Sequence, residues 1–154
     1  MDDQSIKIED AVLAMFLDLV KIPSPSGGEK DVAAYIVEKM LASGFSVWSD
    51  NKGGSNASNS GNIYAYYEVN KDFQTLMFSA HMDTVQGWED VVVPIVEGGS
   101  VKSDGSTVLG ADDKAGVAVL LAVSQFMDKT TIKNNVLFYF PTREEAGVMG
   151  SSLF

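Results

Sequence analysis

Three short clusters of polar residues contain the side chains best suited to acid–base or metal chemistry. The first cluster contains His81, the only histidine of the chain, and Asp83. The second contains Asp112 and Asp113, and the third contains Glu144 and Glu145. The chain has no cysteine, which excludes thiolate metal sites and a disulfide framework. Imidazole nitrogen and carboxylate oxygen are suitable ligands for Zn²⁺, Mn²⁺ or Co²⁺. A pair of such ions would make water nucleophilic at neutral pH and stabilise a tetrahedral intermediate.

The histidine cluster has two interpretations. A single histidine is commonly a surface residue or a hydrogen-bonded core residue. However, Asp83 lies two positions after His81, and in an extended segment both side chains point to the same side. The carboxylate can then hold the second imidazole nitrogen, as the outer partner of a metal-bound histidine does. Asp83 can instead cap a loop, and the sequence leaves both roles open.

The two acidic pairs also have alternative explanations. Asp112 and Asp113 directly precede a helix-forming segment, so they can cap that helix at its N-terminus while still facing a ligand. Pairs of glutamates are mostly solvated. Glu144 and Glu145, however, follow an apolar run and Pro141-Thr142, which indicates the edge of a sheet.

The segments around these clusters predict an α/β fold with a mostly parallel central sheet flanked by helices. Residues 76–78 and 136–140 are continuously apolar, as is typical of central strands covered on both faces. Residues 115–123 are almost wholly apolar over a helical length, which predicts a buried crossover helix between two parallel strands.

Ligands of such sheets bind outside the carboxyl ends of the parallel strands, and the three clusters fall at these junctions. We therefore expect His81, Asp112 and Glu145 to converge within a few ångströms.

The first half of the chain predicts two helices and two strands. Residues 10–21 carry an apolar stripe at helical spacing, which consists of Leu13, Phe16, Leu17 and Val20. Pro23 and Pro25 end this helix. Ser26 and Glu29 match a capping box that opens a second helix, which Gly44 ends. The apolar face of the second helix consists of Ala33, Ile36, Val37 and Met40. Strands are expected at residues 45–49 and 63–69, and a surface loop at 50–62.

The composition excludes several classes of protein. The chain has 154 residues, of which 45% are apolar, and this suits one globular domain. Its net charge of −10 repels phosphate backbones, so we expect no nucleic-acid partner. No apolar run is long enough to span a membrane. The acidic residues 1–4 do not resemble a secretory signal, and we expect a cytoplasmic protein.

Three motifs in this order resemble those of the co-catalytic zinc peptidases of the peptidase T, carboxypeptidase G and aminoacylase family. The motifs are Ser79-Ala80-His81-Met82-Asp83-Thr84-Val85, Leu109-Gly110-Ala111-Asp112-Asp113-Lys114-Ala115-Gly116 and Arg143-Glu144-Glu145-Ala146-Gly147. They are most similar to the peptidase T-like branch, and the resemblance extends to the N-terminal helices and to the turn at Ser24-Pro25-Ser26-Gly27.

The resemblance implies a role for each residue. His81 would bind one Zn²⁺ ion, and Asp83 would orient its ring. Asp112 would bridge the two ions and join Asp113 through a cis peptide bond. Glu145 would bind the second ion, and Glu144 would be the general base.

The chain departs from the family pattern after Glu145. The family needs a further acidic ligand and a second histidine, but this chain has one histidine and only nine residues after Glu145. A lid domain that helps to form dimers is also absent. We therefore interpret residues 1–154 as the N-terminal part of a catalytic domain, inactive by itself. An apolar patch or open strand edge beside residues 136–140 would be covered by another segment or by a second copy.

The expected activity is hydrolysis of the amide bond of short peptides. An N-acyl amino acid amidohydrolase of the same family is an alternative, and a non-catalytic binding or structural module is another.

Overall fold

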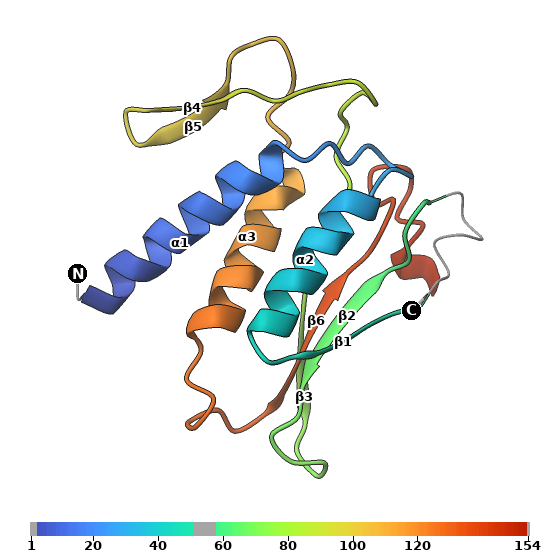
Figure 1. Cartoon of the computed structure of the whole chain (residues 1–154). Coiled ribbons are helices and arrows are strands. Elements are labelled where there is room, and N and C mark those ends of the chain that lie inside the picture. The colour runs from blue at the N-terminus through green and yellow to red at the C-terminus, as the bar shows by residue number, and fades with distance from the viewer. Residues whose placement is uncertain (1–2, 51–57, 154) are drawn as a thin grey trace.

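The computed structural model describes residues 3–50 and 58–153 of the chain. The central element is a four-stranded sheet with the order β1-β2-β6-β3. Its strands are β1 (Ser46–Ser49), β2 (Ile63–Tyr67), β3 (Thr75–Ser79) and β6 (Asn135–Phe140). Three helices accompany the sheet: α1 (Asp3–Val20), α2 (Lys30–Ala42) and α3 (Ala111–Phe126). Figure 1 shows the helices in a row, with α3 between α1 and α2. The α/β class expected from the sequence is confirmed.

The sheet is mixed, whereas the sequence predicts a mostly parallel one. β3 and β6 are parallel and are connected through α3, so the expected βαβ unit is present. β1 pairs with β2 and β2 pairs with β6 in antiparallel orientation. Antiparallel neighbours need no crossover helix, and β2 follows β1 without one.

The helices cover one face of this sheet. Ile63 and Ala65 of β2 lie opposite Phe140 and Phe138 of β6, and all four belong to one apolar core with residues of the three helices. Side chains alternate along a strand, so Tyr64 and the other intervening residues point to the opposite face. There three aromatic rings form a row, with centroids 5.3 and 5.0 Å apart: Trp48, Tyr64 and Tyr139.

β3 is not the covered central strand that the sequence predicts. It lies at the edge of the sheet with β6 as its neighbour, and all of its residues are exposed. Leu76, Met77 and Phe78 are about half exposed, at 49%, 50% and 45%. The expected open apolar edge therefore belongs to β3, whereas β6 has a neighbour on each side.

The helices differ from the prediction in their buried faces. In α1, Phe16 and Val20 are buried as expected, but Leu13 is exposed. α2 buries most of the predicted face, and Gly44 ends it with a φ of +78°. α3 is buried on one side only, since Val119 and Val123 are 44% and 42% exposed.

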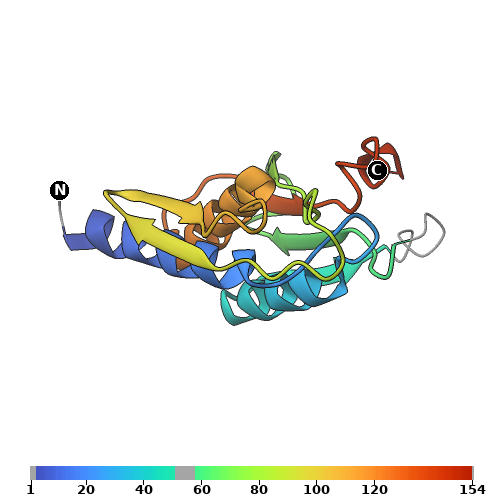
Figure 2. The same ribbon diagram turned by 90° about the horizontal axis from the view of Figure 1, so that it is seen from above.

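A hairpin of β4 (Pro94–Glu97) and β5 (Ser100–Ser103) was not predicted from the sequence. It forms a separate two-stranded sheet at the end of the molecule where α1 ends and α3 begins (Figures 1 and 2). Gly98 and Gly99 form its turn with φ values of +60° and +76°, conformations that favour glycine. A short 3-10 helix, η2 (Ser151–Leu153), follows the last strand.

Residues 51–57 of the loop expected at 50–62 lie outside the described residues. In the described end of this loop Asn59 is exposed as expected, whereas Ser58 and Asn62 are buried. Across the described part of the chain, none of the helices has both the length and the apolar character needed to cross a bilayer.

The half-buried position of α3 can be tested with two substitutions that lie two residues apart, on opposite sides of the helix. Leu121→Ala removes a fully buried side chain and should lower the free energy of unfolding by about 2–5 kcal/mol. Val119→Ala truncates an exposed side chain and should change it by less than about 0.5 kcal/mol. Urea unfolding followed by circular dichroism measures both. Equal losses would mean that α3 is buried all round, as the sequence alone predicts.

Candidate active site

His81 lies two residues beyond the end of β3 and is held through one ring nitrogen. Nδ1 is 2.9 Å from the main-chain carbonyl oxygen of Asp83 and 3.5 Å from the carboxylate Oδ1 of the same residue. The Nδ1–H group therefore donates to the carbonyl, and the carboxylate supplies a nearby negative charge. This arrangement leaves Nε2 facing the other two clusters. The sequence predicts that the carboxylate of Asp83 holds this ring nitrogen, whereas the shorter contact comes from its main-chain carbonyl.

The carboxylate of Asp83 binds the loop that carries the glutamate pair. It is fully buried, and its Oδ1 accepts a hydrogen bond from the backbone N–H of Glu144 at 2.8 Å. Its Oδ2 accepts one from the N–H of Glu145 at 3.1 Å and one from the hydroxyl of Ser26 at 2.6 Å. Burial raises the pKa of Asp83, but these hydrogen bonds and His81 together hold it below its usual value.

The three predicted clusters meet at one place, beyond the ends of β3 and β6 and at the start of α3 (Figure 1). His81 Nε2 is 3.1 Å from Asp112 Oδ1 and 3.8 Å from Glu144 Oε2. His81, Glu144 and Glu145 each offer a ligand atom, and these atoms lie within 4.8 Å of one another. The structure thus brings Asp112 and both glutamates close to His81, whereas the group of three possible ligands contains Glu144 and not the predicted Asp112.

The sequence leaves open whether Asp112 and Asp113 cap a helix or face a ligand, and in the structure each residue takes one of these two positions. Their peptide bond is cis, as the resemblance implies, and their backbone angles are not helical. The carboxyl of Asp113 accepts hydrogen bonds from the backbone of His81 and Gly116, so it caps the regular part of α3. Asp112 is 85% exposed and faces His81.

Sequence reasoning assigned Ser26 and Glu29 to a capping box, and this is wrong. The side chain of Glu29 makes no capping hydrogen bond to α2. Ser26 instead binds Asp83, and the fully buried Glu29 accepts the backbone N–H of Arg143 at 3.0 Å. The only sequence signal for this role is that a Ser and a Glu lie in a Pro/Gly-rich turn.

The donor set fits a divalent cation. Ligands bound at 2.0–2.2 Å from Zn²⁺ lie at most about 4.4 Å apart, so the cluster of His81, Glu144 and Glu145 needs only a small contraction. Burial lowers the pKa of His81, but hydrogen bonds and charges from Asp83, Asp112 and Asp113 raise it to about 9. Burial raises the pKa of Glu145 against the effect of His81. The cluster thus holds surplus negative charge that a cation would neutralise.

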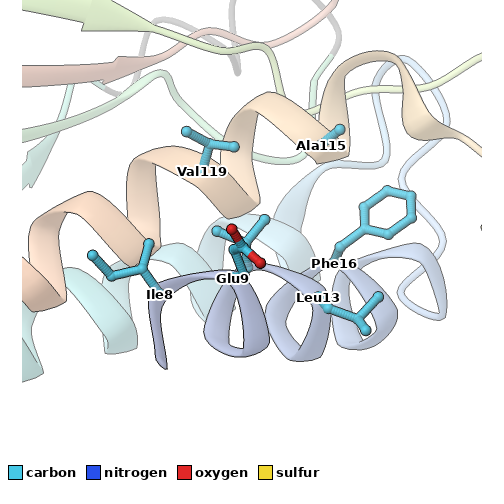
Figure 3. A pocket seen from close by; sticks show the side chains of 7 residues that line it. Ile8, Glu9, Leu13, Phe16, Ala115 and Val119 are labelled. Carbon is cyan, nitrogen blue, oxygen red and sulfur yellow. The ribbon is translucent and has the colours of Figure 1, made fainter. Parts of the chain in front are cut away.

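An apolar groove lies elsewhere, between α1 and α3. It has a volume of about 370 Å³, and Figure 3 shows that both helices line it. The lining is apolar except for one carboxylate: Ile8, Glu9, Val12, Leu13, Phe16, Ala115 and Val119. It offers no second polar group for chemistry, so the cluster around His81 is the candidate site.

The comparisons with known proteins identify the family to which the chain belongs. Residues 62–154 match the model of peptidase family M28, and the chain belongs to this family. The structure is similar to a tripeptidase from Staphylococcus aureus, with 33% identity and a TM-score of 0.85. It is also similar to the aminopeptidase PepT from Bacillus cereus, with 26% identity and a TM-score of 0.86. The peptidase T-like resemblance is thereby confirmed.

The chain spans only part of these relatives. The two structures each match 95% of this chain and 39% of their own length. The protein YqjE from Bacillus subtilis is 33% identical over 93% of this chain and 38% of its own length. The chain therefore corresponds to about two fifths of each.

Gly116 provides a test of the cap on α3. Alanine is the better helix former by about 1 kcal/mol, but a Cβ at position 116 would lie 2.3 Å from Asp113 Oδ1. Gly116→Ala should therefore expel the Asp113 carboxyl and lower the free energy of unfolding by about 1 kcal/mol or more. Thermal and urea unfolding measure this change.

A double-mutant cycle supplies the control. In an Asp113→Ala background the clash is absent, so Gly116→Ala should be neutral or stabilising. A Gly116→Ala variant that is more stable than the native chain would show that Asp113 does not occupy this position.

Proposed function

We propose that the protein containing this chain is a metal-dependent peptidase that hydrolyses the amide bond of short peptides. The observation that carries the proposal is the convergence of one imidazole and several carboxylates, from three separate motifs, in a member of a peptidase family. The similarity to a tripeptidase and to an aminopeptidase supports short peptides as the substrate class.

The residues that would hold the metal are His81, Asp112 and Glu145. Following the resemblance, Asp112 would contact both members of a Zn²⁺ pair, with Mn²⁺ or Co²⁺ as alternatives. The metal, when bound, supplies Lewis-acid chemistry that polarises the scissile carbonyl and makes water more acidic. Asp83 would keep the His81 Nδ1–H fixed through its carbonyl, so that Nε2 remains the ligand atom.

Glu144 is proposed as the general base. Its side chain is 40% exposed and lies 3.8 Å from His81 Nε2, beside the proposed ligands and open to substrate. The carboxylate would take a proton from the attacking water and deliver it to the departing amine nitrogen. Its oxygen also belongs to the possible ligand group with His81 and Glu145, so the competing role is that of a metal ligand.

We further propose that these 154 residues are the N-terminal part of the catalytic domain. The remaining ligands, an acidic residue and a histidine, would come from sequence that the longer relatives contain. With three of the ligands, the chain alone should bind Zn²⁺ weakly and turn over no substrate. A cytoplasmic location and a homo-oligomer remain predictions from the sequence.

The roles of the two glutamates are tested in the full-length protein. Glu144→Gln should keep its metal content and KM while kcat falls by about 10²–10⁴-fold, since only the base is lost. Glu145→Gln should lose affinity for one ion, and added Zn²⁺ should restore part of the activity. Metal analysis and kinetics with di- and tripeptides measure both effects.

The same assays separate the alternatives. If Glu144→Gln loses metal while Glu145→Gln stays loaded and active, the two roles are reversed. Hydrolysis of N-acyl amino acids but not of peptides would establish the amidohydrolase. A native full-length protein that binds no metal and cleaves neither substrate would be a binding or structural module.

A further inference from the structure

The turn after β6 has an unusual backbone at Arg143. Its φ is +54°, in the left-handed region that residues with a side chain seldom occupy. Such a conformation is unfavourable for a residue with a side chain, so surrounding contacts must hold it. This turn directs the next two residues, Glu144 and Glu145, towards His81.

Two buried carboxylates hold three successive N–H groups of this turn. Asp83 accepts the N–H groups of Glu144 and Glu145 at 2.8 and 3.1 Å. Glu29 Oε1 accepts the N–H of Arg143 at 3.0 Å. Hydrogen bonds to charged acceptors are stronger than those between neutral groups, so the two carboxylates hold the backbone of this turn firmly in place.

Glu29 is itself held from two directions. Its Oε1 also accepts the N–H of Gly27 at 2.9 Å, and its Oε2 accepts the hydroxyl of Ser58 at 2.6 Å. The side chain is fully buried, and burying a carboxylate is unfavourable unless donors surround it. An apolar residue would fill this position at lower cost, so stability alone does not explain a glutamate here.

Capping of the adjacent helix α2 does not explain the glutamate at position 29 either. It precedes α2 directly, but its side chain makes no capping hydrogen bond to that helix. The first N–H of the helix, at Lys30, is bound instead by the side-chain oxygen of Asn59 at 2.9 Å. The carboxylate of Glu29 instead joins the Arg143 turn to Gly27 and Ser58.

We propose that Glu29 is a positioning residue for catalysis: its carboxylate fixes the Arg143 turn and thereby places Glu144 and Glu145 opposite His81. The inference rests on the function proposed above, because it assigns Glu29 to the same site. It adds the residue that supports the general base and the ligand from a distant part of the chain.

Two substitutions of Glu29 separate geometry from packing. Glu29→Gln has nearly the same shape, and its amide oxygen can still accept the N–H groups of Gly27 and Arg143. Glu29→Ala removes all three accepted hydrogen bonds. Asn59→Ala is the matched control, because it removes the contact to Lys30 at the start of α2 without touching Glu29.

The first readout is amide hydrogen exchange in the full-length protein, which does not depend on activity. Glu29→Ala should accelerate exchange in residues 142–147 at least about 10-fold while β2 and β6 remain protected. Glu29→Gln and Asn59→Ala should leave residues 142–147 protected. Unchanged hydrogen exchange of residues 142–147 in Glu29→Ala would overturn the inference. A loss of protection throughout the chain in both Glu29→Ala and Glu29→Gln would also overturn it.

The second readout is kinetics with a short peptide and Zn²⁺. Glu29→Ala should lower kcat by about 10- to 100-fold with KM within about 2-fold, because the reacting groups are displaced while the substrate contacts remain. Glu29→Gln should recover most of this loss, and Asn59→Ala should match the native enzyme. A Glu29→Ala enzyme with native kcat would overturn the inference and leave the proposed peptidase intact. A native protein without activity or metal would overturn the proposed function, and the exchange experiment would still decide the role of Glu29 in the turn.

Discussion

The candidate site depends on the hydrogen bonds that the buried carboxylate of Asp83 accepts. Its oxygens accept hydrogen bonds from Ser26, Glu144 and Glu145, so they join the turn after α1 to the loop after β6. A buried carboxylate is tolerable only when it is hydrogen-bonded, and here each donor comes from a segment that the fold must bring in. The same residue holds His81 through its carbonyl oxygen. One residue therefore fixes the relative positions of the histidine, through its main-chain carbonyl, and of both glutamates, through its carboxylate.

Other buried polar groups extend this framework around the strand ends. The amino group of Lys114, fully buried at the start of α3, donates to the carbonyl of Ile22 at 2.6 Å and ties the helix to the end of α1. Burial lowers the pKa of Lys114 to about 8. Asn62 accepts the N–H of Thr142 at 3.0 Å and donates to the carbonyl of Gly150. The apolar core holds the layers together, whereas hydrogen bonds of this kind set the loops that carry the chemistry.

Strong local patterns in the sequence predict the candidate site and much of the fold. The residue types, their order and their positions at strand ends predict that His81 lies near the acidic pairs. They also predict the parallel pairing of β3 and β6. They failed where tertiary context decides, since an apolar run such as residues 76–78 does not reveal whether its strand is central or at an edge. The β4–β5 hairpin does have a local signal, because Gly98-Gly99 lies between two short segments that carry apolar residues.

Burial explains why the acidic residues could be found but not fully assigned. Asp83 and Glu29 are fully buried, and both accept backbone N–H groups of the Arg143 turn. Asp112 and Glu144 are 85% and 40% exposed, and their oxygens face His81. A carboxylate whose lone pairs are used by N–H donors positions its neighbours, whereas one open to solvent remains available to a cation or a substrate. Both kinds are simply Asp or Glu in the sequence, and Glu29 even occupies a capping-box spacing. The contacts that separate them span up to 114 positions along the chain, which is why no local pattern contains them.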